Sequence, residues 1–421
     1  MIVFYLLVVS LPFALQPWFA RPIGPLTVEK LLGAACALYA MVHLAAKRRI
    51  PRLFSTLEAR SFLVFVALAA ASWAAMRTGP ASDDMMSVYA SHFVFFVVLL
   101  AVVDTPGRLR LTLLAAIAGI GWASLYVLRE WQVQTAIYGT SFRPGYVTGD
   151  SNFFTASAVL VVPLAALVLQ RDQSRLARLF TFGCLAAALV AIVVGASRGG
   201  FVGLVAGILW MLWRAPRRGR NLAILGTLLA VFLALAPSSP LKRFLHPDSG
   251  DLESEQIHLR LWAAAWRIIQ AHPLTGIGVG NFKYEVAGYT SHPDLRYMAH
   301  NTYLEISSEM GLPGLLAFLL MFFSAIVSYG RLAREAERTH DMQIAMTANG
   351  AQAGLVGFGV AALFVSAEFL RMFWFLLFLA MCLGPLRRAQ SEHAAEPVGA
   401  EASAAEPSWP PEPEAGTGSC E

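Results

Sequence analysis

Residues 86–103 read MSVYASHFVFFVVLLAVV, a run of 18 residues without Asp, Glu, Lys or Arg. At a rise of about 1.5 Å per residue, a helix of this length nearly crosses the hydrocarbon core of a bilayer. A helix also satisfies its own backbone hydrogen bonds, which a lone strand in lipid cannot do. The stretch therefore predicts a membrane-spanning helix and sets the fold class.

Similar apolar blocks recur along the chain, whose residues are 57% hydrophobic and only 14% charged. We expect an all-α integral membrane protein with about twelve transmembrane helices. The first block has no basic segment before it, so we expect a retained helix and not a cleaved leader. The expected spans are residues 2–20, 27–46, 61–77, 86–103, 109–129, 152–169, 176–195, 199–213, 221–236, 312–331, 346–366 and 369–386.

One long interruption separates the ninth and tenth expected spans. Residues 237–311 hold eight acidic and six basic side chains, which predicts one large loop without a generic basic patch. The chain then divides into residues 1–236 with nine spans, this loop, and residues 312–388 with three spans. Residues 389–421 are rich in Ala, Glu and Pro, a composition typical of a disordered tail.

The distribution of Lys and Arg predicts the orientation, because these residues concentrate in cytoplasmic loops. With the N-terminus inside, 19 of the 32 basic residues fall in inside loops and seven in the short outside loops. We therefore expect both termini in the cytoplasm and the large loop outside. Since the basic excess is a topology signal, a nucleic-acid partner is excluded.

Residues 255–271 of the loop predict an amphipathic helix. Apolar residues recur at helical spacing from Ile257 to Ile268. Trp262 and Trp266 lie beside this stripe and favour a helix at the membrane surface.

Three arginines are candidates for binding an anion. Arg198 lies between two apolar blocks, where a guanidinium needs a partner or an anion. An arginine that snorkels to lipid phosphates is the alternative. Arg260 and Arg267 are seven residues apart and share a helix face, and an arginine can grip a phosphate with two hydrogen bonds. An ordinary solvated face is the alternative for this pair.

His300 lies where the loop meets the tenth expected span. A neutral imidazole there can act as a general base. Glu305 or Glu309 would orient this histidine or would simply cap the helix. Asp150 and Asn152 open the sixth expected span, where both residue types suit a helix N-cap.

Residues 275–282, TGIGVGNF, form a glycine-rich turn. Because no strand–turn–helix unit surrounds it, a dinucleotide site is disfavoured, and we expect a tight loop packed under the arginine helix. The four cysteines contain no CxxC pair, and the loop histidines lack metal-ligand spacing. We expect no metal and no cofactor.

Four stretches in order resemble the O-antigen ligase and O-antigen polymerase superfamily of bacterial envelope glycosyltransferases. They are residues 149–154 (GDSNFF), 196–200 (ASRGG), 260–262 (RLW) continuing to 272–278 (HPLTGIG), and 300–303 (HNTY) with 309–314 (EMGLPG). Twelve spans with a large outer loop between the ninth and tenth match the superfamily as well. The resemblance covers about residues 1–388.

The resemblance implies an enzyme that takes a glycan from undecaprenyl diphosphate at the periplasmic face of the inner membrane and passes it to an acceptor hydroxyl. It implies that Arg198 and Arg260 hold the diphosphate and that His300 activates the acceptor, without a metal. Arg267, Arg143, Asp150, Asn152, Glu305 and Glu309 are secondary candidates.

Several functions remain open within and beyond this resemblance. The acceptor can be a lipid A-core sugar, as in a ligase, a growing polysaccharide, as in a polymerase, or a protein side chain, as in an O-oligosaccharyltransferase. The histidine favours the ligase. A polytopic lipid or sugar transporter is the alternative of a different class. The nearly charge-free helix interiors and the lack of a visible half-repeat disfavour it.

Overall fold

The computed structural model describes residues 1–13, 22–23, 26–47, 55–76, 79–138, 142–145, 150–171, 174–214, 249–292 and 294–395. These residues are almost entirely helical. The helices are α1 (Ile2–Ser10), α3 (Val28–Lys47), α4 (Leu57–Met76), α5 (Pro80–Val102), α6 (Pro106–Tyr138), α7 (Ser151–Arg171), α8 (Arg175–Val194), α9 (Arg198–Arg214), α12 (Ser249–Ala271), α13 (Phe282–Glu285), α14 (Thr302–Arg338), α15 (Met342–Ala361) and α16 (Arg371–Ala395). The structure also has two short 3₁₀ helices, η1 (Leu11–Phe13) and η4 (Val286–Tyr289). Two strands of two residues each, β1 (Pro22–Ile23) and β2 (Leu26–Thr27), pair antiparallel.

Seven helices of the described residues are long and apolar enough to cross a membrane, namely α3 to α8 and α14. The protein is therefore a multi-pass membrane protein. Eleven of the expected spans overlap a helix, and the span at 221–236 lies outside the described residues. The total of twelve spans stays a prediction.

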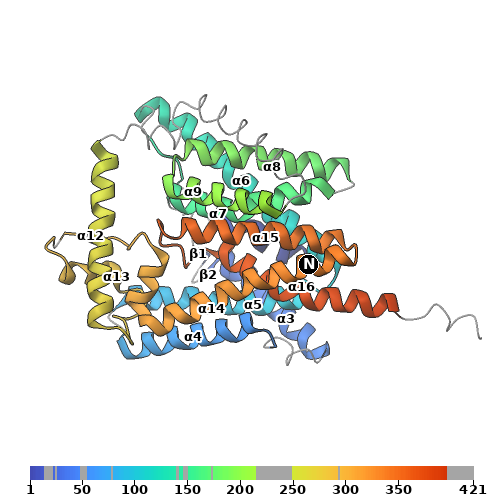
Figure 1. Cartoon of the computed structure of the whole chain (residues 1–421), viewed down its shortest axis with the longest axis horizontal. Helices are drawn as coiled ribbons and strands as arrows, with labels where there is room; N and C mark the ends of the chain where they lie inside the picture. The colour runs from blue at the N-terminus through green and yellow to red at the C-terminus, as the bar shows by residue number, and fades with distance from the viewer. Residues whose placement is uncertain are drawn as a thin grey trace, which may run out of the picture.

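The long helices run side by side, and α15 lies among α7, α9 and α14 (Figure 1). Its contact with α9 depends on glycine. A Cβ at Gly203 would lie 2.6 Å from the Gly357 carbonyl oxygen, and a Cβ at Gly357 would lie 2.7 Å from the Gly203 carbonyl oxygen. Small residues at such a crossing let two helix backbones approach closely inside a membrane protein.

Helix α12 crosses one end of the bundle at a steep angle to the long helices (Figure 1). The helix includes the predicted residues 255–271, so that prediction is confirmed. Its apolar stripe, however, does not face lipid. Leu261 and Ile268 are fully buried against Phe282, Val286 and other residues of the same loop. Trp266 alone of the two tryptophans is mainly exposed.

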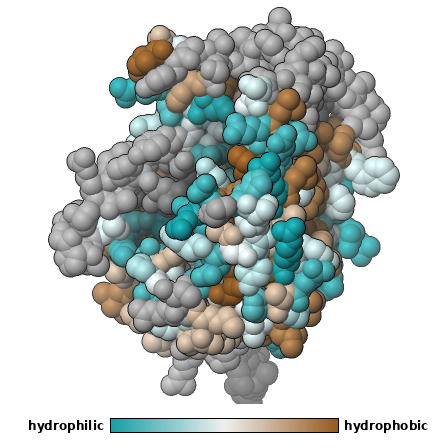
Figure 2. Space-filling view, turned by 90° about the vertical axis from the view of Figure 1, so that its left-hand side faces the viewer, coloured by the Kyte–Doolittle hydropathy of each residue, from teal (hydrophilic) through white to brown (hydrophobic). Residues whose placement is uncertain are grey.

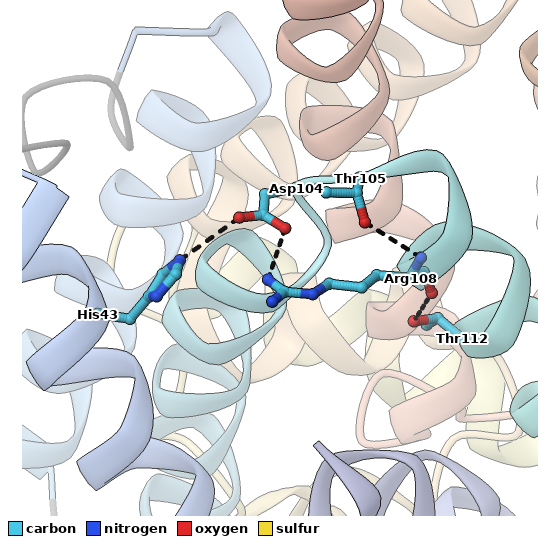
Figure 3. Close-up of polar contacts among 5 residues, drawn as sticks. All are labelled: His43, Asp104, Thr105, Arg108 and Thr112. Atoms are coloured by element: carbon cyan, nitrogen blue, oxygen red, sulfur yellow. Dashed lines mark hydrogen bonds and ion pairs between the residues drawn. The ribbon is translucent and has the colours of Figure 1, made fainter.

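Seen from the end that α12 crosses, hydrophilic residues run down the middle of the surface, with hydrophobic ones to the side (Figure 2). At the opposite end of α5, polar contacts join three segments (Figure 3). Asp104 accepts a hydrogen bond from Arg108 Nη1 at 2.6 Å and lies 3.4 Å from His43 Nε2 of α3. These contacts tie α3 to the turn between α5 and α6.

Helix α14 begins inside the expected loop, and its break at Gly311 falls directly before the expected start of the tenth span at 312. Helix α14 starts at Thr302, not at 312, because the Asn301 side chain accepts hydrogen bonds from the Tyr303 and Leu304 N–H groups and caps it. The last residues of the expected loop are therefore helical. The helix breaks at Gly311, whose φ is 68°.

Candidate functional site

His300 is held in a backbone conformation that only a well-anchored residue adopts. Its φ is +49°, in the left-handed region that non-glycine residues rarely occupy. Before it, the Ala299 N–H donates to Glu305 Oε2 at 2.6 Å, and the Ala299 carbonyl accepts from Trp262 Nε1 at 3.0 Å. After it, the Thr302 N–H lies 2.9 Å from the carbonyl oxygen of Ala362. Both flanks of the histidine are thus fixed by buried partners.

The ring of His300 stacks on the ring of His258 from α12. The ring centroids are 4.6 Å apart and the planes differ by 26°. Burial lowers the pKa of His300, and Asp150 partly opposes this. Burial lowers the pKa of His258 to about 4, with further contributions from His300, Arg198 and Arg143. Both imidazoles are therefore neutral at neutral pH, as a general base must be.

Arg143 and Asn152 connect the entry of α7 to the entry of α9. Arg143 Nη2 donates to Ser151 Oγ at 2.7 Å and to Asn152 Oδ1 at 3.2 Å. Asn152 Oδ1 also accepts from Ser197 Oγ at 2.7 Å, and Ser197 Oγ accepts from the Gly200 N–H and caps α9. Arg198, the first residue of α9, is positioned by this network.

The expected N-cap at Asp150 is confirmed. Its Oδ1 accepts from the Asn152 N–H at 2.6 Å. The same residue lines a cavity of about 870 Å³ together with His300. Asp150 therefore both starts α7 and faces the cavity.

This cavity lies between the loop and the ends of the helices that the loop covers. Its polar lining includes Glu305, Glu309, Lys283 and Arg371, and Tyr284 and Tyr297 add aromatic faces. Carboxylates and tyrosines of this kind can accept and donate hydrogen bonds to sugar hydroxyls. The arrangement thus places a neutral imidazole beside a space with the chemistry and volume for a saccharide.

Glu305 and Glu309 are buried and have structural partners. Glu305 Oε2 also accepts from Ser366 Oγ, and Glu309 Oε1 accepts from the Phe282 N–H at 3.1 Å. Of the two predicted roles, holding the backbone at the histidine fits Glu305, whose carboxylate binds the Ala299 N–H. Glu309 instead ties α13 to α14.

The glycine-rich turn at 275–282 packs against the break in α14. Pro313 has no N–H, and Leu312 donates to the Pro273 carbonyl at 2.8 Å instead of to its own helix. The carbonyls of Ser308 and Glu309 accept from the Ile277 and Gly278 N–H groups, at 2.9 and 3.0 Å. The turn is tight, as predicted, and it completes the hydrogen bonds of a broken transmembrane helix.

None of the four candidate arginines lines the His300 cavity itself. Arg143 and Arg198 lie close enough to His258 to lower its pKa, whereas Arg260 and Arg267 lie elsewhere. Arg260 lines a separate cleft of about 430 Å³ with Glu253, His292 and Asp294, and this cleft shares Tyr297 with the larger cavity. Arg267 Nη1 donates to the Tyr289 carbonyl at 2.8 Å and so supports the fold of the loop. The structure brings His300, Asp150, Arg143, Arg198 and Asn152 together but places this pair elsewhere.

Sequence reasoning missed His258, which was one loop histidine among several. It lies only two residues before Arg260, and on a helix that difference points the two side chains to opposite sides. Which side meets the site depends on how α12 docks. Among the described residues, no group of three His, Cys, Asp or Glu side chains is arranged to hold a metal ion.

The family model described as O-antigen ligase matches residues 182–319. The match runs from α8 through the large loop into α14 and includes Arg198, Arg260 and His300. It confirms the resemblance to the O-antigen ligase superfamily. No curated protein matches the chain.

Proposed function

Because residues 182–319 carry the domain of the O-antigen ligase superfamily, whose members are membrane glycosyltransferase-like enzymes, we propose that this protein is a ligase-type glycosyltransferase. It moves a glycan from undecaprenyl diphosphate to the hydroxyl of a lipid A-core or similar sugar at the periplasmic face of the inner membrane. One observation carries the proposal: a neutral, rigidly held His300 lines a polar cavity beside the arginine cluster.

The reaction uses the histidine as base. His300 takes the proton of the acceptor hydroxyl while that oxygen forms a bond to the anomeric carbon of the donor glycan. The bond from this carbon to the diphosphate oxygen breaks, and undecaprenyl diphosphate leaves with the bonding electrons. The proton then passes from His300 to solvent. A positioned base contributes about 10²–10⁴ in rate.

Arg198 stabilises the negative charge that develops on the diphosphate. Arg143 lies in the same cluster, and its contacts to Ser151 and Asn152 keep its own guanidinium group preorganised. Arg260 is proposed as the second diphosphate contact, reaching the donor from the adjoining cleft across Tyr297. With this leaving group already activated, the step needs no metal.

A strain that lacks the gene, complemented with wild type or with His300→Ala, tests the proposal. Lipid A-linked and undecaprenyl-linked glycans are separated and run on gels. Wild type should restore the long-chain ladder on lipid A-core. His300→Ala should leave the ladder on undecaprenyl diphosphate, whereas His340→Asn, a change at the exposed turn after α14, should behave as wild type.

The other outcomes identify the alternatives. If the deletion strain still transfers single repeat units to lipid A-core but makes no long chains, the protein is a polymerase. Loss of glycan from proteins alone indicates an O-oligosaccharyltransferase. Full activity of His300→Ala, with glycan precursors trapped inside the cell only in the deletion strain, indicates a transporter.

A further inference from the structure

The His300 cavity adjoins two further spaces of different character. A groove between α1, α3 and α5 shares Arg371 with the cavity and continues along apolar residues of α5. The cleft of about 430 Å³ that contains Arg260 shares Tyr297 with the cavity instead. This Arg260 cleft is formed by α12 and the loop segment that follows Tyr289, and most of its lining residues are exposed.

The Arg260 cleft combines a fixed apolar floor with a polar rim. Leu295 is 7% exposed, and Leu295 and Ile257 belong to the apolar cluster that holds α12 to the loop. The floor is therefore part of the folded loop. The exposed lining residues are polar or aromatic, namely Glu253, Gln256, Arg260, Ser291, Asp294 and Tyr297.

This combination suits a sugar ring better than a lipid or a phosphate. A pyranose has an apolar C–H face, which packs on an aromatic or aliphatic surface, and an edge of hydroxyl groups, which amides, hydroxyls and carboxylates bind. A lipid tail would take the polar rim out of water without offering it hydrogen bonds. A phosphate would meet two carboxylates, those of Glu253 and Asp294, against the one guanidinium of Arg260.

Tyr297 connects this cleft to the proposed site of transfer. The residue is 53% exposed and lines both spaces. A cavity of about 870 Å³ has the size of a small-molecule pocket, so a long-chain glycan extends beyond it. Of the two adjoining spaces, the Arg260 cleft offers hydrogen bonds to sugar hydroxyls along that path, whereas the groove along α5 is largely apolar.

We infer that the Arg260 cleft is a second saccharide site, which binds sugars of the donor glycan beyond the one whose anomeric carbon reacts. The inference rests on the proposed function and adds a specificity to it, because donors with several repeat units bind more tightly than donors with one. The reacting sugar lies beside His300, the following sugars pass Tyr297, and their hydroxyls meet the polar rim, chiefly Gln256, Ser291 and Asp294. Arg260 stays available to the diphosphate.

Binding of lipid-free oligosaccharides to the full-length protein in nanodiscs tests the cleft without requiring transfer. The probes contain one or three repeat units and are released by mild acid from the envelope polysaccharide of the source strain. Isothermal titration calorimetry should show that three units bind about tenfold more tightly than one, as one or two added hydrogen bonds provide. Gln256→Ala combined with Asp294→Ala should abolish this preference, and Ser291→Trp, which fills the cleft, should abolish it as well.

Gln270→Ala combined with Glu255→Ala is the matched control, because both residues are exposed on α12 and line neither space. It should keep the preference for three units. Equal affinity of the wild type for one and three units would overturn the inference, and so would equal effects of the cleft variant and the control. If inorganic diphosphate removes the preference, the cleft is a phosphate site and the inference is also wrong.

Transfer assays with lipid-linked donors separate this inference from the proposed function. The variant with Gln256→Ala and Asp294→Ala should raise KM about tenfold for a three-unit donor, with kcat and the KM of a one-unit donor unchanged. If the oligosaccharides bind as expected but the wild type transfers no glycan, the proposed function fails and the saccharide site stands. If the wild type transfers glycan with the same KM for both donors, the cleft inference alone fails.

Discussion

The imidazole of His258 on α12 lies face to face with the imidazole of His300 at the start of α14, at a centroid distance of 4.6 Å. One ring belongs to a helix that crosses the end of the bundle, and the other to the junction with a transmembrane helix. The docking of α12 therefore covers one face of the proposed base. It also brings His258 close to Arg143 and Arg198, which help to lower the pKa of His258.

Replacing His258 tests whether the stacked ring positions His300. His258→Ala should lower kcat/KM about ten- to a hundredfold, because a loosened base loses its alignment with the acceptor. His258→Phe retains a flat ring and should recover most of the activity. Leu259→Ala changes an exposed neighbour and should have no effect. Equal loss in both His258 variants would contradict a stacking role.

The pH dependence of kcat/KM follows from the direction of the His300 pKa. Burial lowers this pKa, so the base stays neutral below the usual histidine value of about 6.5. Activity should fall only as the pH drops through the lowered pKa. Asp150→Asn removes a charge that raises it, so the acidic limb should move to lower pH. His258→Ala exposes the His300 ring to solvent, which should raise the pKa of His300 and move the acidic limb of the profile to higher pH.

The hydrogen bonds of Asn152 should matter for turnover through Arg143 and Arg198. Asn152→Ala removes the acceptor shared by Arg143 and Ser197 and should reduce kcat/KM about tenfold or more. Asn152→Asp keeps an acceptor oxygen and should retain more activity. Ser174→Ala removes the cap of α8 and serves as the control, with unchanged transfer. Initial rates with a purified lipid-linked donor measure the difference.

Glu305 should act through the backbone at His300 and not through its charge. Glu305→Gln keeps an oxygen that can accept from the Ala299 N–H, so it should retain most activity. Glu305→Ala leaves that buried N–H without a partner and should lower kcat. It should also lower the free energy of unfolding by about 1–3 kcal/mol, which appears as a lower unfolding midpoint. If Glu305→Gln is as inactive as Glu305→Ala, the carboxylate charge itself is required.

The break in α14 should be sensitive to a single methyl group. Gly311 has a φ of 68°, and a Cβ there would lie 2.5 Å from the Leu274 carbonyl carbon. Gly311→Ala should destabilise the protein by more than about 1 kcal/mol. Gly288→Ala enters open space and should be neutral. Thermal unfolding in detergent, followed by size-exclusion chromatography, measures both.

Seven of the expected spans coincide with described helices that are long and apolar enough to cross a membrane, because their signal is local. A charge-free run such as 86–103 requires a helix in lipid, and α5 covers it. The helix at 302–310 was assigned to the loop because Glu305 and Glu309 make it look unlike a span, whereas the segment after Gly311 begins where the span was expected. The Asn301 cap was a local signal that could have corrected the boundary.

The site was only partly predictable, for a geometric reason. Asp150, Asn152 and Arg198 were candidates because they lie in short motifs that resemble the superfamily, and all three lie at the entries of helices. Arg260 and His258 sit about 200° apart around α12, and only the packing of the loop decides which one faces His300. The buried contacts of α12 with Phe282 and Val286 make that choice, and they join segments far apart in the chain.

The anchoring of Thr302 has a consequence for biosynthesis. Its N–H and hydroxyl are bound by the Ala362 and Val365 carbonyls, and its Oγ1 accepts from the Ala367 N–H. These partners leave the ribosome some sixty residues after His300 does. The histidine therefore acquires its fixed geometry only once the chain beyond α15 has been inserted. Truncated or stalled chains carry the histidine and the arginines but lack this anchor, so we expect incomplete copies in the membrane to lack the proposed transfer activity.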